Sequence, residues 1–291
     1  MTPLDYDFLR KLLKERSGLD LSAEKQYLVE SRLLPLARKS GLEGISELVQ
    51  RLKAGAEALT SEVVEAMTTN ETFFFRDKIP FDHLRETVLP SLLQARANRK
   101  SLRIWSAASS TGQEPYSIAM LLKEKEPALS GWRVEIVATD LSQGVLEKSK
   151  AGIFSQFEVQ RGLPIQLLVK YFTQMGELWQ LNADIRAMVA HRQLNLLQDF
   201  SHLGKFDVIF CRNVLIYFDQ DTKAAILERL AKTIEPDGFL MLGAAETVVG
   251  ITDAFKPCAE RRGLYQPNME RAPRSNVGLA MPQGLKAVAA R

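Results

Sequence analysis

Several features that mark other protein classes are missing from this sequence. It contains two cysteines, Cys211 and Cys258, which are too few for a disulfide framework and favour a reducing, cytoplasmic location. No apolar run approaches the ~20 residues that a membrane-spanning helix needs. The N-terminus also lacks the basic-then-apolar pattern of a signal peptide. We therefore expect a cytoplasmic protein that does not insert into a membrane.

The motifs of several enzyme classes are absent as well. The three histidines, His83, His191 and His202, are isolated, and no H-E-x-x-H or cysteine-pair pattern accompanies them, so we expect no metal site. The G-x-S-x-G motif of hydrolases is missing. There is no P-loop lysine and no G-x-G-x-x-G, which leaves a nicotinamide oxidoreductase as a distant alternative.

The body of the chain has no excess of basic charge. The net charge is +3, but the residues from Met269 onward carry four basic side chains and one acidic one. The remaining 268 residues therefore hold 34 basic and 34 acidic side chains. A general nucleic-acid binder usually has a basic surplus in its folded part, so we expect no nucleic-acid partner.

What is present is the composition of a globular protein, with 46% hydrophobic and 25% charged residues. The first 68 residues show the apolar spacing of short helices. Thr2 and Pro3 suit the start of the first helix and Gly18 its end, while Pro35 is expected to kink or shorten the second. The predicted helices lie at about 2–18, 22–39, 45–52 and 63–67.

After Thr68 the pattern changes, and from Leu102 apolar β-rich runs alternate with helical patterns. The predicted strands are 102–105, 134–139, 206–210 and 239–242, and the predicted helices are 116–126, 143–150 and 221–234. This alternation predicts an α/β fold, with a doubly wound, mostly parallel, Rossmann-like sheet covered by helices on both faces. A small all-α domain precedes it.

The alternation is interrupted between Gly152 and His191. Turn residues and a short strand at 178–181 predict a small β insertion there, and residues 235–238 are predicted to form a turn into the last strand. The residues after Gln266 lack periodicity and predict a flexible tail. The predicted units are an all-α domain at 1–68, a linker at 69–80, an α/β domain at 81–268 with an insertion at 152–193, and a tail at 269–291.

The loop after the first predicted strand is the first candidate for a binding site, because open α/β sheets bind ligands at the carboxyl ends of their strands. Residues 106–117 are mostly small, and Gly112 permits a tight turn. Glu114 would repel a diphosphate but attract a cation such as an α-amine. A favourable interaction with the dipole of the next helix explains Glu114 equally well.

Asp140 follows the second predicted strand, where an acid commonly binds ribose hydroxyls; it could also cap the next helix. Together with the small-residue loop, it suggests an adenosine ligand without phosphates, and S-adenosylmethionine (SAM) fits. Arg76, which follows three phenylalanines that we interpret as core, could bind a carboxylate, although surface ion pairs are commoner. Arg212, Asn213 and Tyr217 follow the third strand and would face the same cleft.

At this point the chain closely resembles the CheR-type chemotaxis receptor methyltransferases. Four motifs carry the resemblance in the same order as in that family, and the likeness extends over residues 1–266. These motifs are Thr69–Arg76, Ser110–Ser117, Ala138–Asp140 and Cys211–Phe218. The resemblance implies an enzyme that transfers the methyl group of SAM to glutamate side chains on the cytoplasmic helices of methyl-accepting chemoreceptors.

The resemblance also implies roles for individual residues. Glu114 would bind the α-amine of SAM and Asp140 its ribose, while Arg76 and Tyr217 would orient the target carboxylate. Cys211, by itself interpreted as packing, would help to line the floor of the cofactor site. The implied cofactor-binding residues are Asn70, Thr72, Arg76, Glu114, Asp140, Asn195, Leu196, Cys211, Arg212 and Asn213. Gln113 and the segment Ala244–Glu246 depart from the common family pattern.

The sequence gives weaker indications of the surfaces that would bind the receptor. Lys25, Arg32 and Lys39 are spaced seven apart and could form a basic stripe for an acidic receptor helix, or simply a solvated face. The insertion at 152–193 corresponds to the part that grips a tethering receptor peptide in some members. We expect a monomer. A SAM-dependent enzyme with another substrate, and a non-catalytic SAM-responsive binding module, are the alternatives.

Overall fold

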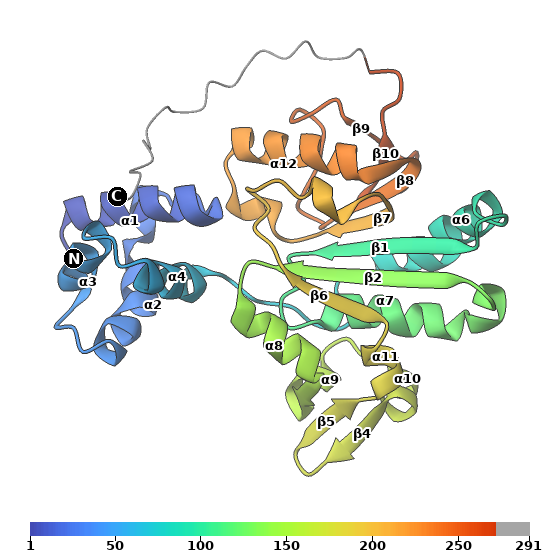
Figure 1. The fold of residues 1–291 in the computed structure, drawn as a ribbon, viewed down its shortest axis with the longest axis horizontal. Coiled ribbons are helices and arrows are strands. Elements are labelled where there is room, and N and C mark those ends of the chain that lie inside the picture. The colour runs from blue at the N-terminus through green and yellow to red at the C-terminus, as the bar shows by residue number, and fades with distance from the viewer. Residues whose placement is uncertain (272–291) are drawn as a thin grey trace, which may run out of the picture.

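The computed structural model describes residues 1–271, so the predicted tail at 269–291 falls mostly outside the described residues. It consists of a bundle of four helices and an α/β part that carries a small second sheet (Figure 1). The predicted fold class is confirmed. No helix within residues 1–271 combines the length and apolar character that crossing a bilayer requires.

The helical bundle has its own apolar core. Helix α1 (Pro3–Ser17) starts with a capping box between Thr2 and Asp5 and ends at Gly18, whose φ of 79° suits glycine. Pro35 lies inside α2 without ending it, and a short 3-10 turn precedes that helix. The remaining helices are α2 (Gln26–Lys39), α3 (Ile45–Lys53) and α4 (Glu57–Met67), and the core includes Leu9, Leu13, Val29, Leu33, Leu48 and Val63.

The main sheet has seven strands in the order β6-β2-β1-β7-β8-β10-β9. The first five are parallel, and β10 and β9 are antiparallel additions at one edge. The strands are β1 (Ser101–Ala107), β2 (Arg133–Asp140), β6 (Val189–Gln193), β7 (Phe206–Cys211), β8 (Ile234–Leu242), β9 (Phe255–Pro257) and β10 (Leu264–Pro267). The sequence did not predict β6, β9 or β10.

Helices cover both faces of this sheet, as predicted. Figure 1 shows α12 (Gln220–Thr233) on one side of the strands and α7 (Gln113–Glu124) on the other. The two faces form separate apolar cores, one around Phe74 and Tyr116 and the other around Trp105 and Phe200. Other helices of the α/β part include α5 (Ile79–His83), a π-helical turn (Leu84–Val88), α6 (Leu89–Ala95) and α8 (Gln143–Ala151). Short 3-10 helices lie at Glu126–Leu129 and Ser201–Leu203.

The predicted insertion forms a three-stranded antiparallel sheet in the order β3-β5-β4. Its elements are β3 (Ile153–Ser155), α9 (Gln156–Gln160), α10 (Ile165–Tyr171), β4 (Phe172–Met175) and β5 (Leu178–Leu181), followed by α11 (Ala183–Arg186). The strand that ends the predicted range, β6, pairs in parallel with β2 and so belongs to the main sheet. Residues 190, 192 and 193 are not buried, so this edge strand lacks a continuous apolar run.

The turn predicted at 235–238 is wrong, because these residues lie within β8. The turn residues have a different effect there. Phe206 is paired with Ile234 and Val208 with Phe239. An advance of two residues along β7 therefore corresponds to an advance of five residues along β8. The extra residues form an irregularity in the strand rather than a break between elements.

The helical bundle lies beyond the carboxyl ends of the central strands. In Figure 1 the arrowheads of β1 and β2 point toward the side where α1 and α4 lie. The backbone N–H of Asp20, just after α1, donates to the carbonyl of Tyr217, and Lys14 forms an ion pair with Asp219. The edge at which an open α/β sheet binds ligands is therefore closed on one side by the bundle.

Candidate active site

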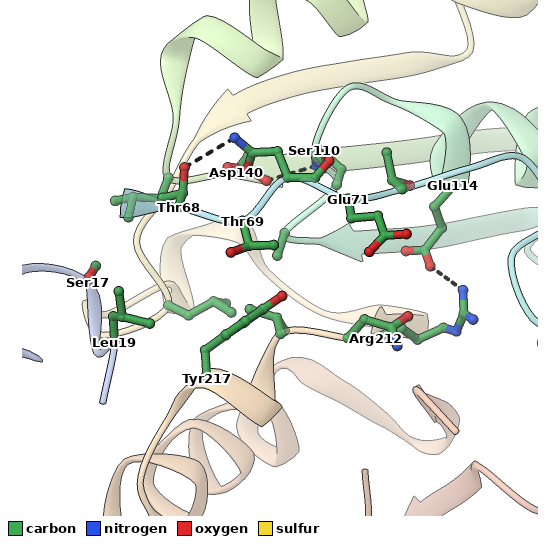
Figure 2. A pocket seen from close by; sticks show the side chains of 18 of the residues that line it. Ser17, Leu19, Thr68, Thr69, Glu71, Ser110, Glu114, Asp140, Arg212 and Tyr217 are labelled. Carbon is green, nitrogen blue, oxygen red and sulfur yellow. Dashed lines mark hydrogen bonds and ion pairs between the residues drawn. The ribbon is translucent and has the colours of Figure 1, made fainter. Parts of the chain in front are cut away.

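A pocket lies between the bundle, the linker and the carboxyl ends of β1, β2 and β7 (Figure 2). Ten of the eleven site residues that were predicted from the sequence are among the residues that line this pocket. These are Asn70, Thr72, Arg76, Glu114, Asp140, Asn195, Leu196, Arg212, Asn213 and Tyr217. The exception is Cys211, which is fully buried inside β7, where burial raises the pKa of its thiol.

The loop after β1 forms the back wall. Ala108 and Ser110 adopt left-handed backbone angles, with φ of 54° and 51°, which cost energy for residues other than glycine and cluster at functional sites. Gly112 is needed for a different reason: a Cβ at this position would lie 2.1 Å from the Ser149 hydroxyl oxygen. Glycine therefore lets the loop pack closely against α8 at this point.

Asp140, at the end of β2, anchors that loop. Its carboxylate accepts hydrogen bonds from the backbone N–H of Ser110 at 2.8 Å and of Ser142 at 3.0 Å. The side chain is buried, and this burial raises the pKa of Asp140 despite the lowering effect of the N–H donors. A buried carboxylate at the tip of a second strand, already oriented by backbone groups, is suited to accept hydrogen bonds from ribose hydroxyls.

Glu114, in the first turn of α7, occupies the other end of the pocket from Ser17 and Leu19 (Figure 2). One of its carboxylate oxygens accepts from the Ser106 hydroxyl at 2.8 Å, and the other pairs with Arg212 at 2.7 Å. The carboxylate is thus fixed in place by two donors while its side chain remains 12% exposed. That arrangement can accept a further cationic donor from the pocket.

Arg212 joins three segments of the site. Besides Glu114, its guanidinium pairs with the Asp77 carboxylate and donates to the carbonyl of Arg76, both at 2.8 Å. Its Nε is buried and has no hydrogen-bond partner. Arg212 therefore attaches the linker to the floor of the pocket.

The linker, residues 69–80, forms part of the pocket wall through residues 69–72 and Arg76. The carbonyl of Asn70 accepts from the Ser110 hydroxyl at 2.9 Å. Phe74 is fully buried in edge contacts with Phe154 and Phe172, which agrees with its interpretation as core. Phe75 has a left-handed φ of 51° next to Arg76. A buried ring and a backbone turn together direct the Arg76 side chain toward the pocket.

Arg76 and Tyr217 reach the pocket from different segments. The Arg76 guanidinium donates to the carbonyl of Glu71 at 2.7 Å and lies over the Phe73 ring, 5.6 Å from its centroid. Figure 2 shows the Tyr217 ring extending from the turn after β7 into the middle of the pocket. Arg161 pairs with Glu71 at 2.6 Å, which lowers the pKa of that carboxyl.

The helical bundle supplies residues that the sequence did not indicate. Ser17 and Leu19, at the end of α1, line the pocket, and Asn195 donates to the carbonyl of Arg16 at 2.7 Å. No local pattern marks them, because they reach the site only through packing between the bundle and the sheet. Arg32, predicted for a receptor-facing stripe, instead donates to the carbonyls of Met67 and Thr68.

The chemistry of the pocket fits SAM. The carboxylates of Glu114 and Asp140 line it as fixed acceptors, and Asn195 and Leu196 line it together with Ser17 and Leu19 of the bundle. Among the described lining residues there is no histidine, lysine or cysteine. No cluster of three His, Cys, Asp or Glu residues within 1–271 could hold a metal ion.

Comparison with known families agrees with this geometry. Residues 70–264 match the model of the CheR methyltransferase SAM binding domain, and residues 4–68 match that of the CheR methyltransferase all-alpha domain. Chemotaxis protein methyltransferase 1 of Pseudomonas aeruginosa is 44% identical over 87% of this chain and 93% of its own length. Chemotaxis protein methyltransferase Cher2 of Pseudomonas putida is 43% identical over 87% and 94%, respectively.

A third relative matches nearly the whole chain. Chemotaxis protein methyltransferase 2 of Vibrio cholerae is 35% identical over 96% of this chain and 98% of its own length. The two family models together cover the helical bundle and most of the α/β part, including the linker motif that holds Arg76. The chain therefore belongs to the CheR methyltransferase family and is a SAM-dependent methyltransferase of chemotaxis.

Proposed function

We propose that this enzyme methylates glutamate side chains on the cytoplasmic helices of chemoreceptors, forming glutamyl methyl esters. One observation carries the choice of acceptor. Tyr217 extends into the middle of the pocket, Arg76 lines it, and no histidine, lysine or cysteine is among the described lining residues. The lining carboxylates of Glu71, Glu114 and Asp140 already accept hydrogen bonds from donors of the protein itself. A carboxylate is already ionised near pH 7 and needs no base, whereas an amine or alcohol acceptor does.

The proposal assigns the residues that would hold SAM. Glu114 accepts from the α-amine, Asp140 binds the ribose, and Asn195 with Leu196 lies at the adenine. The rest of the contacting set is Asn70, Thr72, Arg76, Arg212 and Asn213. We remove Cys211 from the contacting set, since it is fully buried in β7 and does not line the pocket. When bound, SAM supplies an electrophilic methyl group on a positively charged sulfur.

Arg76 and Tyr217 would position the acceptor. They hold the glutamate carboxylate by hydrogen bonds in line with the methyl group, and the helical bundle and linker exclude water. A bond forms between a carboxylate oxygen and the methyl carbon as the carbon–sulfur bond breaks, and the electron pair remains on sulfur. No proton is transferred. Positioning of this kind can contribute about 7–11 kcal/mol.

The receptor would meet the enzyme first through the helical bundle. Of the three basic residues in the predicted stripe, Lys25 and Lys39 remain available, since Lys39 makes only a 3.8 Å pair with Glu62 and both are exposed. Arg32 is engaged with the end of α4 instead. An acidic receptor helix would be attracted to the two lysines.

A second contact would use the small sheet. Strands β3 and β4 are its edges, each paired only with β5. An extended peptide from the C-terminus of a receptor could add to β4 as a further strand, because edge strands offer unpaired backbone groups. We expect a receptor that lacks its last residues to be methylated more slowly if this contact is used.

The test of the proposed function uses purified enzyme, SAM with a labelled methyl group and candidate receptor cytoplasmic domains. Label is expected in the receptor and is expected to leave under mild alkali, because carboxyl methyl esters hydrolyse whereas N-methyl groups do not. Replacing the acceptor glutamates by glutamine provides the control. Alkali-stable label would contradict the acceptor, and binding of SAM without transfer to any receptor would favour a non-catalytic module.

A further inference from the structure

Glu246 is a buried carboxylate that the reaction described above does not use. It lies shortly after β8, and its side chain does not line the pocket. The residue is 9% exposed. Its carboxylate accepts four backbone hydrogen bonds, from the N–H groups of Asn213 (2.8 Å), Val214 (2.9 Å), Ile216 (3.3 Å) and Gly243 (2.7 Å).

These donors belong mostly to the turn that carries Tyr217. Asn213 has a left-handed φ of 57°, and Leu215–Tyr217 form a single 3-10 turn. An isolated turn of this kind has too few internal hydrogen bonds to fix its own conformation. The three N–H groups of residues 213, 214 and 216 converge on one carboxylate, so Glu246 sets the path of the backbone up to Tyr217.

Gly243 makes this approach sterically possible. A Cβ there would lie 2.7 Å from the Glu246 carboxylate and 2.9 Å from the backbone nitrogen of Asn213. Contacts below 3.0 Å force a shift, and here the neighbours include backbone. The glycine that follows β8 therefore allows the Glu246 carboxylate to reach the backbone of the turn.

The helical bundle supports the turn from another side. The Asp20 N–H donates to the carbonyl of Tyr217 at 2.9 Å, while Gly18 packs against Phe218. Without Glu246, the turn would keep this bond and its two internal backbone bonds, from the N–H groups of Tyr217 and Phe218. The N–H groups of residues 213, 214 and 216 would have lost their acceptor. The ring of Tyr217 would then lose its fixed direction into the pocket.

We propose that Glu246 is a positioning residue for Tyr217, acting on methyl transfer through the turn at 213–217. This inference rests on the proposed function, which gives Tyr217 its role toward the acceptor. Glu246→Gln is the sharpest variant, because it keeps the shape of the side chain. One of the two oxygens becomes an amide NH₂, which faces two backbone donors and cannot accept from them.

The first experiment measures turnover in a double-mutant cycle of Glu246→Gln and Tyr217→Phe. We expect Glu246→Gln alone to lower kcat about 10- to 100-fold, as expected for buried donors left without an acceptor. In the Tyr217→Phe background the same change is expected to cost much less, because the group it positions is gone. Equal losses in both backgrounds would overturn the proposal.

The second experiment does not depend on catalysis. Enzyme labelled with 3-fluorotyrosine at its six tyrosines gives ¹⁹F resonances, and the Tyr217→Phe spectrum assigns the one from Tyr217. Glu246→Gln is expected to shift or broaden that resonance and to leave the signal of Tyr171 unchanged. Glu135→Gln on β2, which removes a carboxylate bonded to Arg103 on β1, is the matched control. An unchanged Tyr217 resonance would overturn the proposal.

The two readouts separate this inference from the proposed function. If no receptor is methylated, the proposed function fails, while the ¹⁹F experiment still tests whether Glu246 controls Tyr217. Should Glu246→Gln not fold, Gly243→Ala repeats both measurements with the carboxylate retained and displaced. A fully active Gly243→Ala enzyme with an unchanged Tyr217 resonance would contradict the proposal.

Discussion

Strand β7 has an arginine–carboxylate cluster at each of its ends, and the two clusters differ in kind. At its start, Asp207 is 1% exposed and pairs with Arg96 at 2.8 Å and Arg99 at 2.6 Å, while Arg96 also binds Asp237. The backbone N–H of Arg103 donates to the same Asp207 carboxylate at 2.8 Å. Every charge in this amino-end cluster is paired within the protein.

Directly after β7, Arg212 pairs with Glu114 and Asp77 in what we call the carboxyl-end cluster. Its side chain is 1% exposed, much like that of Arg96, but Glu114 borders a pocket and the Arg212 Nε has no partner. Ion pairs therefore do not distinguish a binding site from a structural network. The distinguishing features are small residues, left-handed backbone angles and an opening to solvent.

The largest effect is expected at the amino-end cluster. Asp207→Ala leaves the buried Arg96 with one partner fewer and removes the acceptor of the Arg103 N–H, so we expect a loss of about 3–5 kcal/mol in the free energy of unfolding. Urea denaturation measures this loss. The folded fraction is expected to bind S-adenosylhomocysteine with unchanged Kd. A selective loss of ligand affinity without loss of stability would reverse our assignment of the two clusters.

Arg76→Ala is expected to have the opposite profile. Removal of the charged donor proposed to orient the acceptor should lower kcat about 100- to 1000-fold. The melting temperature should not change, because the Arg76 side chain makes one exposed hydrogen bond, to the carbonyl of Glu71, and lies over the Phe73 ring. Initial rates with a receptor domain measure the effect. Lys78→Ala, an exposed change in the same linker, is the control. Full turnover in Arg76→Ala would remove Arg76 from the reaction.

A smaller effect is expected from Glu114→Gln, which tests the carboxyl-end cluster directly. The amide can keep hydrogen bonds to Ser106 and Arg212 but loses the negative charge offered to an α-amine. We expect the Kd for S-adenosylhomocysteine to rise about ten-fold, as measured by calorimetry. Glu124→Gln, at the far end of α7, should leave that Kd unchanged. Equal effects of the two changes would argue against a specific contact at Glu114.

Much of the sheet and the site could be predicted from the sequence because the information is local. Buried central strands such as β7 are largely apolar, with Asp207 the exception in β7, and polar site residues lie where the strands end, as Asp140 and Arg212 do. Edge strands such as β6 and β9 are short and partly exposed, so their patterns are weak. Their places become evident only when the neighbouring strands are known.

The missing parts of the site depend on tertiary contacts. Ser17 and Leu19 reach the pocket because the bundle packs against the sheet edge, and Glu246 acts through a turn 30 residues earlier in the chain. The prediction of a surface stripe that includes Arg32 rests on helical periodicity. Periodicity cannot show that the Arg32 side chain binds the end of α4. Periodicity predicts which residues share one face of a helix, but it does not predict which other segments that face contacts.

The smallest expected effect is the change of stability with pH, which we expect to arise from His191 and not from the amino-end cluster. His191 on β6 lies 2.7 Å from the Ser149 hydroxyl, the group that Gly112 approaches beneath the cofactor loop. Burial, and secondarily Lys150, lower its pKa to about 4. At the amino end, pairing raises the pKa of Arg96 and lowers that of Asp237, so both remain charged at mildly acidic pH.

The sign of the pH effect follows from these pKa values. Between about pH 6.5 and pH 4 the unfolded chain binds a proton at His191 that the folded protein does not, so stability falls as the pH falls through this range. Allowing for partial exposure, we expect a loss of about 1–2 kcal/mol that is absent from His191→Gln. Urea denaturation at pH 7.5 and pH 5 measures the difference. If the wild-type protein and His191→Gln lost the same free energy of unfolding between pH 7.5 and pH 5, the acid sensitivity would not arise from His191.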